Sequence, residues 1–151
     1  NIVSGVVYAI VLPFVALATV YVYFDAQCPH CGELWKASQP LLGEVKMVWI
    51  PVGIMNRASV SQGAALLGAF NPAQAMTAHE VELSTNRRGM KADFPSSGQR
   101  KVIEANTALF TRIGGNSIPL VLSKHAVTGE LVRQEGSAAT PALRQLLGLA
   151  P

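Results

Sequence analysis

The chain has 151 residues, of which 50% are hydrophobic and 14% charged, and its twelve Lys and Arg against nine Asp and Glu give a formal charge of +3. This balance excludes an intrinsically disordered chain, which needs low hydrophobicity and high charge, and a coiled coil, which would be rich in Glu and Lys. The length fits a single domain over residues 1–151, and the weak basic excess gives no reason to expect nucleic acid as a partner.

The first segment, from Ile2 to Phe24, contains no charged residue and is long enough to be a candidate membrane helix. It is dense in β-branched residues and tyrosines, which favour strands, and Pro13 would interrupt a helix in its middle. We therefore predict two buried strands, at about Val6–Val11 and Thr19–Phe24, joined around Leu12–Phe14. No signal peptide is visible, because a basic segment and a small-residue cleavage site are both missing.

A helix is predicted to begin in the sequence Cys28-Pro29-His30-Cys31. Proline fits the first position of a helix, which makes Cys28 the expected N-cap. Leu34, Trp35, Leu41 and Leu42 then fall on one apolar face, so Trp35 is interpreted as a core residue; Pro40 should kink the helix, and Gly43 should end it.

The remaining elements follow from capping and periodicity. A strand is predicted at Val45–Pro51, and two further strands are predicted at Leu120–Ser123 and Glu130–Gln134. The segment between them reads as helical, with helices at Val60–Phe70, Pro72–Leu83 (capped by Asn71) and Gln99–Arg112, and a loop at Asn86–Ser97; a last helix is capped by Thr140-Pro141 and ends at Gly148. This order predicts an α/β fold.

Two thiols three positions apart at a helix start can exchange with disulfides. A thiolate at a helix N-terminus accepts backbone N–H bonds and lies at the positive end of the helix dipole, so Cys28 is the expected nucleophile. Cys31 lies one turn inside the helix and should be the more buried, resolving thiol. A protonated His30 would stabilise the thiolate further, and a stabilised reduced form predicts an oxidising couple.

Metal binding is the main alternative for this cysteine pair. Structural zinc needs four ligands, and the three histidines, His30, His79 and His125, have no ligand spacing to the cysteines or to one another. We therefore expect no metal site and no cofactor; two inert buried thiols are the remaining alternative. His79 and His125 are interpreted as solvated surface residues. Asp25 is interpreted mainly as a loop-capping carboxylate, with tuning of the thiols as the second interpretation.

The segment Val20–Cys31 resembles the active-site strand and turn of the bacterial periplasmic thiol:disulfide interchange proteins of the DsbC/DsbG family, with DsbG the more similar. The resemblance continues through Gln39-Pro40, the strand ending near Pro51-Val52-Gly53, and Asn71-Pro72, and it reaches Ser117-Ile118-Pro119 and the terminal helix. It implies a thioredoxin-like fold with a helical insertion between the central strands, at about residues 58–113.

The resemblance also implies which residues act. Cys28, Pro29, His30 and Cys31 would form the redox centre, and Pro119 would follow a cis peptide bond and face the cysteines. Ser117, Ile118 and Pro119 would then line a substrate groove, where the backbone of Ile118 can pair with an extended substrate segment. The implied partners are periplasmic proteins with thiols or disulfides and a membrane redox partner of the DsbD type.

Three departures from the family keep other functions open. Pro29-His30 is the dipeptide associated with the oxidase DsbA, and Ile118 stands where the family usually has Thr. There is no room before Val6 for the family's N-terminal dimerisation domain, so we expect this chain to be a monomer although the full-length family members form homodimers. The leading hypothesis is an isomerase, reductase or sulfenic-acid reductase of the DsbG type. The alternatives are a monomeric DsbA-like oxidase and a thioredoxin-like chaperone or binding module with a structural disulfide.

Overall fold

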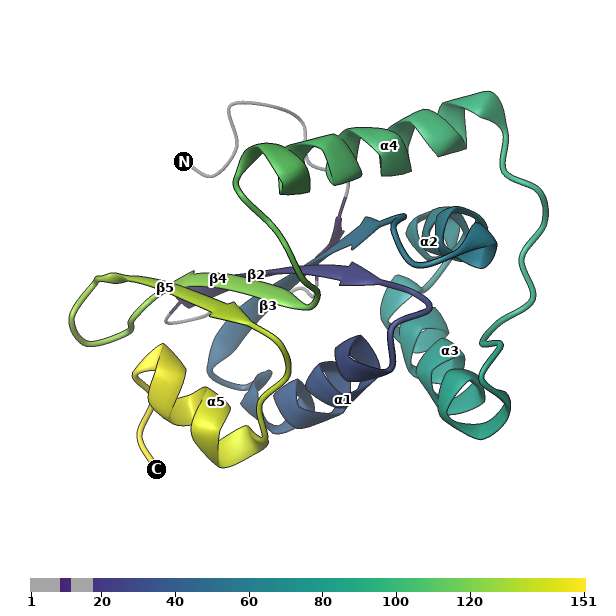
Figure 1. Cartoon of the computed structure of the whole chain (residues 1–151). Coiled ribbons are helices and arrows are strands. Elements are labelled where there is room, and N and C mark those ends of the chain that lie inside the picture. The colour runs from purple at the N-terminus through teal and green to yellow at the C-terminus, as the bar shows by residue number, and fades with distance from the viewer. Residues whose placement is uncertain (1–8, 12–17) are drawn as a thin grey trace.

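A mixed β-sheet forms the centre of the protein. The structure, a computed structural model, describes residues 9–11 and 18–151, and within these residues the sheet has five strands in the order β1-β3-β2-β4-β5 (Figure 1). The neighbouring strands β2 and β3 run parallel, and every other pair is antiparallel. The strands are β1 (Ile10–Val11), β2 (Ala18–Asp25), β3 (Val45–Val52), β4 (Leu120–Lys124) and β5 (Leu131–Glu135).

Helices cover both faces of this sheet (Figure 1). One face carries α1 (Pro29–Ser38), the short 3-10 helix η1 (Gln39–Leu41) and α5 (Thr140–Leu147), while α4 (Ser97–Arg112) lies across the other. The helices α2 (Arg57–Gly68) and α3 (Pro72–Asn86) lie beside the end of the sheet at which β2 and β3 finish. This end is also where α1 begins, so the insert helices flank the start of α1.

The alternation of side chains along β2 and β3 builds a core on each face. Val20, Val22 and Phe24 of β2 belong to the core under α1 and α5, whereas Tyr23 belongs to the core under α4. The strands are apolar on both sides because both faces are covered. This explains why the sequence shows nearly continuous apolar runs instead of a strict alternation with polar residues.

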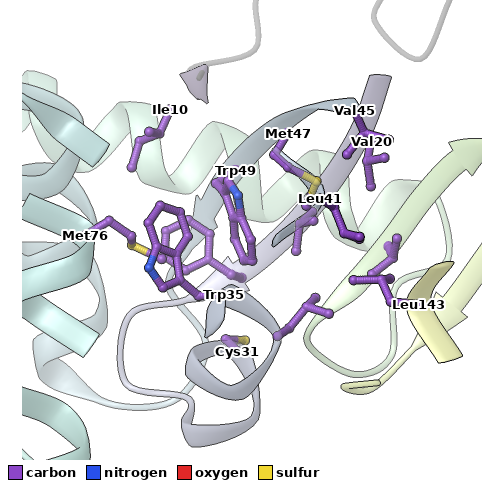
Figure 2. Packing of buried hydrophobic residues seen from close by; sticks show 14 of the residues in the cluster. Ile10, Val20, Cys31, Trp35, Leu41, Val45, Met47, Trp49, Met76 and Leu143 are labelled. Carbon is purple, nitrogen blue, oxygen red and sulfur yellow. The ribbon is translucent and has the colours of Figure 1, made fainter. Parts of the chain in front are cut away.

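Two tryptophans and a phenylalanine form the centre of the core beneath α1. The ring of Trp49 on β3 packs edge-on against Trp35 of α1 and Phe24 of β2, with ring centroids 5.1 and 5.7 Å away. Figure 2 shows Cys31 at the border of this cluster and Met76 of α3 reaching it from the insert. The interpretation of Trp35 as a core residue is confirmed, since it is 4% exposed.

Most predicted elements are confirmed, with shifts at their ends. Asn56 caps α2 with a capping box, so that helix starts three residues before the predicted Val60 and ends at Gly68. Pro40 does not bend a continuing helix: α1 ends at Ser38 and the chain goes on as one 3-10 turn. Of the predicted strand Val6–Val11, Ile10 and Val11 are strand; the rest, and the turn at Leu12–Phe14, lie outside the described residues.

The cap predicted for the last helix is wrong. The N-cap of α5 is Ala139, which makes no side-chain hydrogen bond, and Thr140 is the first helical residue. The hydroxyl of Thr140 donates instead to the carbonyl oxygen of Ala37 at 2.8 Å, so it ties α5 to the end of α1. As for a membrane segment, no helix in residues 9–11 and 18–151 combines the length and hydropathy that a bilayer span requires.

Candidate active site

The two cysteines occupy the first turn of α1, directly after the carboxyl end of β2. Cys28 is the N-cap of the helix, with extended backbone angles, and Pro29 takes the first helical position as predicted. The Sγ of Cys28 accepts a hydrogen bond from the backbone N–H of Cys31 at 3.4 Å. Both thiols are free, and both are buried, with Cys28 3% and Cys31 0% exposed.

The environment moves the two thiols in opposite directions. The side chain and backbone N–H of Cys31, then the backbone N–H and positive charge of His30, lower the pKa of Cys28 to about 7 although burial opposes this. Burial, together with the neighbouring Cys28, raises the pKa of Cys31 far above that of a free thiol. Near neutral pH the pair therefore holds one thiolate, on Cys28, and one thiol, on Cys31.

His30 contributes less than the sequence suggested. Its ring is exposed and faces Glu33, with Nδ1 3.2 Å from the carboxylate, and this partner raises the pKa of His30. The charge of His30 is the smallest of the influences that lower the pKa of Cys28. Donation from Cys31, which lies inside the helix, stabilises the thiolate more than the exposed imidazolium does.

The loop before β4 lies across from the cysteines. The Ile118–Pro119 peptide bond is cis, as the resemblance implies, and the Sγ of Cys28 lies 4.0 Å from the carbonyl oxygen of Ile118. Pro119 is buried and its carbonyl accepts from Gly136, while Ile118 is half-buried. Ser117 is exposed, with its hydroxyl 3.4 Å from Glu135. The structure thus brings the predicted groove residues to Cys28, with Ser117 outermost.

Asp25 is a buried capping carboxylate, which confirms its main interpretation. Its Oδ1 accepts from the backbone N–H of Gln27 at 2.9 Å, and its Oδ2 accepts from those of Ile54 and Met55 at 2.8 and 2.9 Å. It therefore joins the loop before Cys28 to the segment that follows β3. Its charge also acts on the pKa values of Cys31 and His79.

The interpretation of His79 as a solvated surface residue is wrong, because its side chain is fully buried. Its Nε2 donates to the carbonyl oxygen of Ala26 at 2.6 Å, and its Nδ1 accepts from the backbone N–H of Met90 at 3.0 Å. This pattern requires a neutral ring, and burial lowers the pKa of His79 accordingly. The histidine thereby fastens α3 to the loop that carries the nucleophile.

A second polar group strengthens the same junction. The Nε2 of Gln62 on α2 donates to the carbonyl oxygens of Arg88 and Met90, and its Oε1 accepts from Gln27 of the active-site loop. His125 also differs from its interpretation: it is half-buried, and its Nδ1 accepts from the backbone N–H groups of Val127 and Thr128 inside the hairpin loop.

Sequence reasoning missed Glu80, which follows His79 on α3 and is 8% exposed. A pattern in the sequence could have revealed both residues. Met76 and Leu83 are seven positions apart and apolar, so positions 79 and 80 between them lie on the same helix face. All four side chains are buried in the structure. As for metal binding, the part of the chain that the structure describes contains no cluster of three or more His, Cys, Asp or Glu side chains placed to hold an ion.

Comparison with known proteins supports the resemblance seen in the sequence. No family model matches the chain. It is 29% identical to the thiol:disulfide interchange protein DsbG of Pseudomonas aeruginosa over 131 residues, and 29% identical to DsbG of Escherichia coli over 104 residues. These alignments cover 85% and 68% of this chain, so it is a DsbG-like sequence over most of its length.

The fold comparison gives the architecture. A periplasmic thioredoxin-like protein from Salmonella enterica serovar Typhimurium superposes with a TM-score of 0.72 at 15% identity, over 93% of this chain and 88% of the other. The α/β structure is therefore thioredoxin-like, as predicted. The chain spans about half the length of the curated relatives it matches, 50% of the Pseudomonas protein and 42% of the Escherichia protein.

Proposed function

We propose that the chain is a periplasmic thiol–disulfide oxidoreductase that acts on protein substrates through Cys28 and Cys31. The observation that carries the proposal is the division of roles within the pair: a thiolate with a pKa of about 7 at the helix N-cap, and a buried neighbour held as a thiol. A nucleophile that is ionised at ambient pH and a resolving thiol within reach are what disulfide exchange requires.

In the reductive direction the Cys28 thiolate attacks one sulfur of a substrate disulfide, and the other substrate sulfur leaves as a thiolate. This step forms a mixed disulfide between Cys28 and the substrate. Cys31 then loses its proton and attacks the sulfur of Cys28, which releases the second substrate sulfur and closes the Cys28–Cys31 disulfide. A reduced partner must restore the dithiol, and a membrane reductase of the DsbD type suits that role.

The groove loop orients the substrate for this attack. The cis Ile118–Pro119 bond places the carbonyl oxygen of Ile118 beside the Cys28 sulfur, where the backbone of an extended substrate can pair with it. A sulfenic acid can react at the same place: the thiolate displaces hydroxide from the oxidised sulfur, which leaves as water after taking a proton, and Cys31 resolves the mixed disulfide as before.

A DsbA-like oxidase is the second candidate, and the sequence Pro29-His30 with Ile118 before the cis-proline favours it. The reduction potential against glutathione separates the two. A potential of about −120 mV is that of a strong oxidant, and about −180 mV that of an isomerase. A binding module with a structural disulfide is less well supported, since the thiolate of Cys28 would have no role in it.

Insulin reduction with matched variants tests the proposal. The unaltered chain should reduce insulin, Cys28→Ser should lose the activity to background, and Cys31→Ser should accumulate a mixed disulfide with the substrate that mass spectrometry detects. Activity that survives Cys28→Ser would refute the assigned nucleophile. An inactive but folded unaltered chain that nevertheless binds unfolded protein would favour the binding module.

A further inference from the structure

Glu80 is a buried carboxyl group that the proposed reaction has not used. It lines a groove of about 560 Å³ between α1 and α3, together with Pro29, Gly32 and Trp35. Its Oε1 is shielded from solvent and has no hydrogen-bond partner among the described residues. Its Oε2 lies against Gly32, where even a methyl group would overlap it, so the carboxyl sits directly on the first turn of α1.

The surroundings favour the neutral form of this carboxyl. Burial, and then the negative charge of the Cys28 thiolate, raise the pKa of Glu80 to about 8. Of the other charged groups nearby, Glu33 and Lys36 of α1 border the same groove and are exposed, and the only charged residue of α2, Arg57, is exposed at its start. Asp25 is committed to backbone N–H groups, and neutral His79 is turned to Ala26 and Met90.

We propose that Glu80 holds the second proton that the reduction of a substrate disulfide requires, taking it up when Cys28 becomes a thiolate and giving it up when the Cys28–Cys31 disulfide forms. The inference rests on the proposed function. Glu80 acts through the charge on Cys28 and is a positioning residue for the proton. The raised pKa supports the inference, because the part of it that comes from Cys28 disappears once that charge is consumed.

The reaction balances with this assignment. The reduced chain carries a Cys28 thiolate, a Cys31 thiol and a neutral Glu80, so it holds two protons and one negative charge. After it reduces a substrate disulfide, the chain has a Cys28–Cys31 disulfide and an ionised Glu80, and the substrate has gained two electrons and two protons as a dithiol. One of these protons comes from Cys31 and the other from Glu80, so no proton has to be taken from solvent.

The dependence of the reduction potential on pH measures the number of protons taken up. Each proton per two electrons changes the equilibrium constant tenfold per pH unit, which is about 29.6 mV. In the unaltered chain the two-proton slope should extend up to about pH 8. In Glu80→Gln it should change to the one-proton slope at about pH 7, where Cys28 ionises, so the two equilibrium constants diverge by up to tenfold over that unit of pH.

Glu82→Gln is the matched control, because it removes an exposed carboxyl two residues further along the same helix and should leave the slope unchanged. As a second measurement, infrared difference spectra at pH 7.5 should show a protonated-carboxyl band that appears on reduction and is missing in Glu80→Gln. Identical slopes in the unaltered chain and Glu80→Gln would overturn the inference, as would a band that persists in that variant. A chain that forms no reversible couple with glutathione would end the proposed function and this inference together. A normal couple without insulin reduction would count against the proposed activity alone.

Discussion

At the scale of single residues, position within one helical turn separates two chemically identical side chains. Cys28 lies at the N-cap, where the N–H of Cys31 donates to its sulfur, and Cys31 lies beneath it with no exposed surface. Stabilisation of the thiolate lowers one pKa, and removal from water raises the other. The same helix terminus thus supplies both the nucleophile and the protonated thiol that resolves it.

The thiolate absorbance of the reduced protein should titrate with a midpoint of about 7. Cys31→Ala should raise this midpoint towards the free value near ~8.5, and more than His30→Gln does, because donation from Cys31 is the largest influence and the charge of His30 the smallest. A midpoint near ~8.5 in the unaltered chain would contradict the assignment.

The same shift makes the stability of the reduced fold depend on pH. The pKa of Cys28 is lower in the folded chain than in the unfolded chain, so the contribution is complete above the pKa of the unfolded thiol and is lost as pH falls through about 7. Its size is about 2–3 kcal/mol, since one unit corresponds to about 1.4 kcal/mol. Urea unfolding of the reduced unaltered chain and of Cys28→Ser, each at pH 9 and pH 6, measures it.

Ile118 is the residue of the groove whose side chain can be exchanged with least disturbance. It is half-buried and packs against the cores on both faces of the sheet. We expect Ile118→Thr to cost about 1–2 kcal/mol of stability and to change the rate of insulin reduction, because the side chain adjoins the carbonyl that faces Cys28. Ser117→Ala, further from the sulfur, serves as the control. A folded Ile118→Thr variant with an unchanged rate would show that this side chain does not shape the site.

At the scale of elements, α3 has a structural task beyond covering the core. Met76 reaches the main cluster, and the next turn presents His79 to Ala26 and Glu80 to Gly32. The loop before Cys28 is therefore held from two sides, by Asp25 within its own chain segment and by α3 of the insert. A rigid loop keeps the nucleophile in a fixed position relative to the Ile118–Pro119 turn.

Replacing His79 should weaken this attachment. His79→Leu leaves the carbonyl of Ala26 and the N–H of Met90 without their partner, and we expect a loss of about 1–3 kcal/mol in the free energy of unfolding at pH 7.5. The exposed His30 provides the control: His30→Gln should cost much less. Equal stability of His79→Leu and the unaltered chain would contradict the role assigned to this contact.

The contact also predicts sensitivity to acid. Because the pKa of His79 is lower in the folded than in the unfolded chain, its contribution is complete above about 6.5 and is lost as pH falls from there through the folded pKa. Unfolding curves between pH 7.5 and 5 should show this loss in the unaltered chain and a smaller one in His79→Leu.

At the scale of the whole molecule, the exposed apolar side chains are dispersed. Phe70 and Phe94 lie on the loops that flank α3, whereas Val127 and Leu131 lie on the β4–β5 hairpin, at the other end of the sheet (Figure 1). A specific dimer would bury roughly 1,200–2,000 Å² in total, and its centre is usually a continuous apolar patch. A monomer with one accessible cysteine pair can exchange disulfides but encloses no substrate.

We therefore predict that the 151-residue chain sediments as a monomer at micromolar concentration. It should reduce insulin yet restore activity to scrambled ribonuclease poorly, because isomerisation requires the substrate to be retained between successive exchanges. Sedimentation velocity and the ribonuclease assay test the two statements separately. A stable dimer with strong isomerase activity would contradict both.

The sequence by itself determined whatever depends on a few neighbouring residues. Cys28 as N-cap, Pro29 at the first helical position, the Asn71 cap of α3 and the buried strands at β2 and β3 all follow from local backbone preferences and from runs of apolar residues. The position of Pro119 in the groove came from resemblance alone, since local preferences favour a trans bond.

Only the tertiary structure decided which polar side chains are buried. The sequence His79-Glu80 lies in a polar stretch that is typical of a solvated helix face, and its burial depends on α1 packing against that face. Thr140 likewise left its predicted capping role because Ala37, about a hundred residues earlier, offers its hydroxyl a partner. Such partners are brought together by the sheet order and the helix packing, and desolvation by those neighbours sets the pKa values of His79 and Glu80.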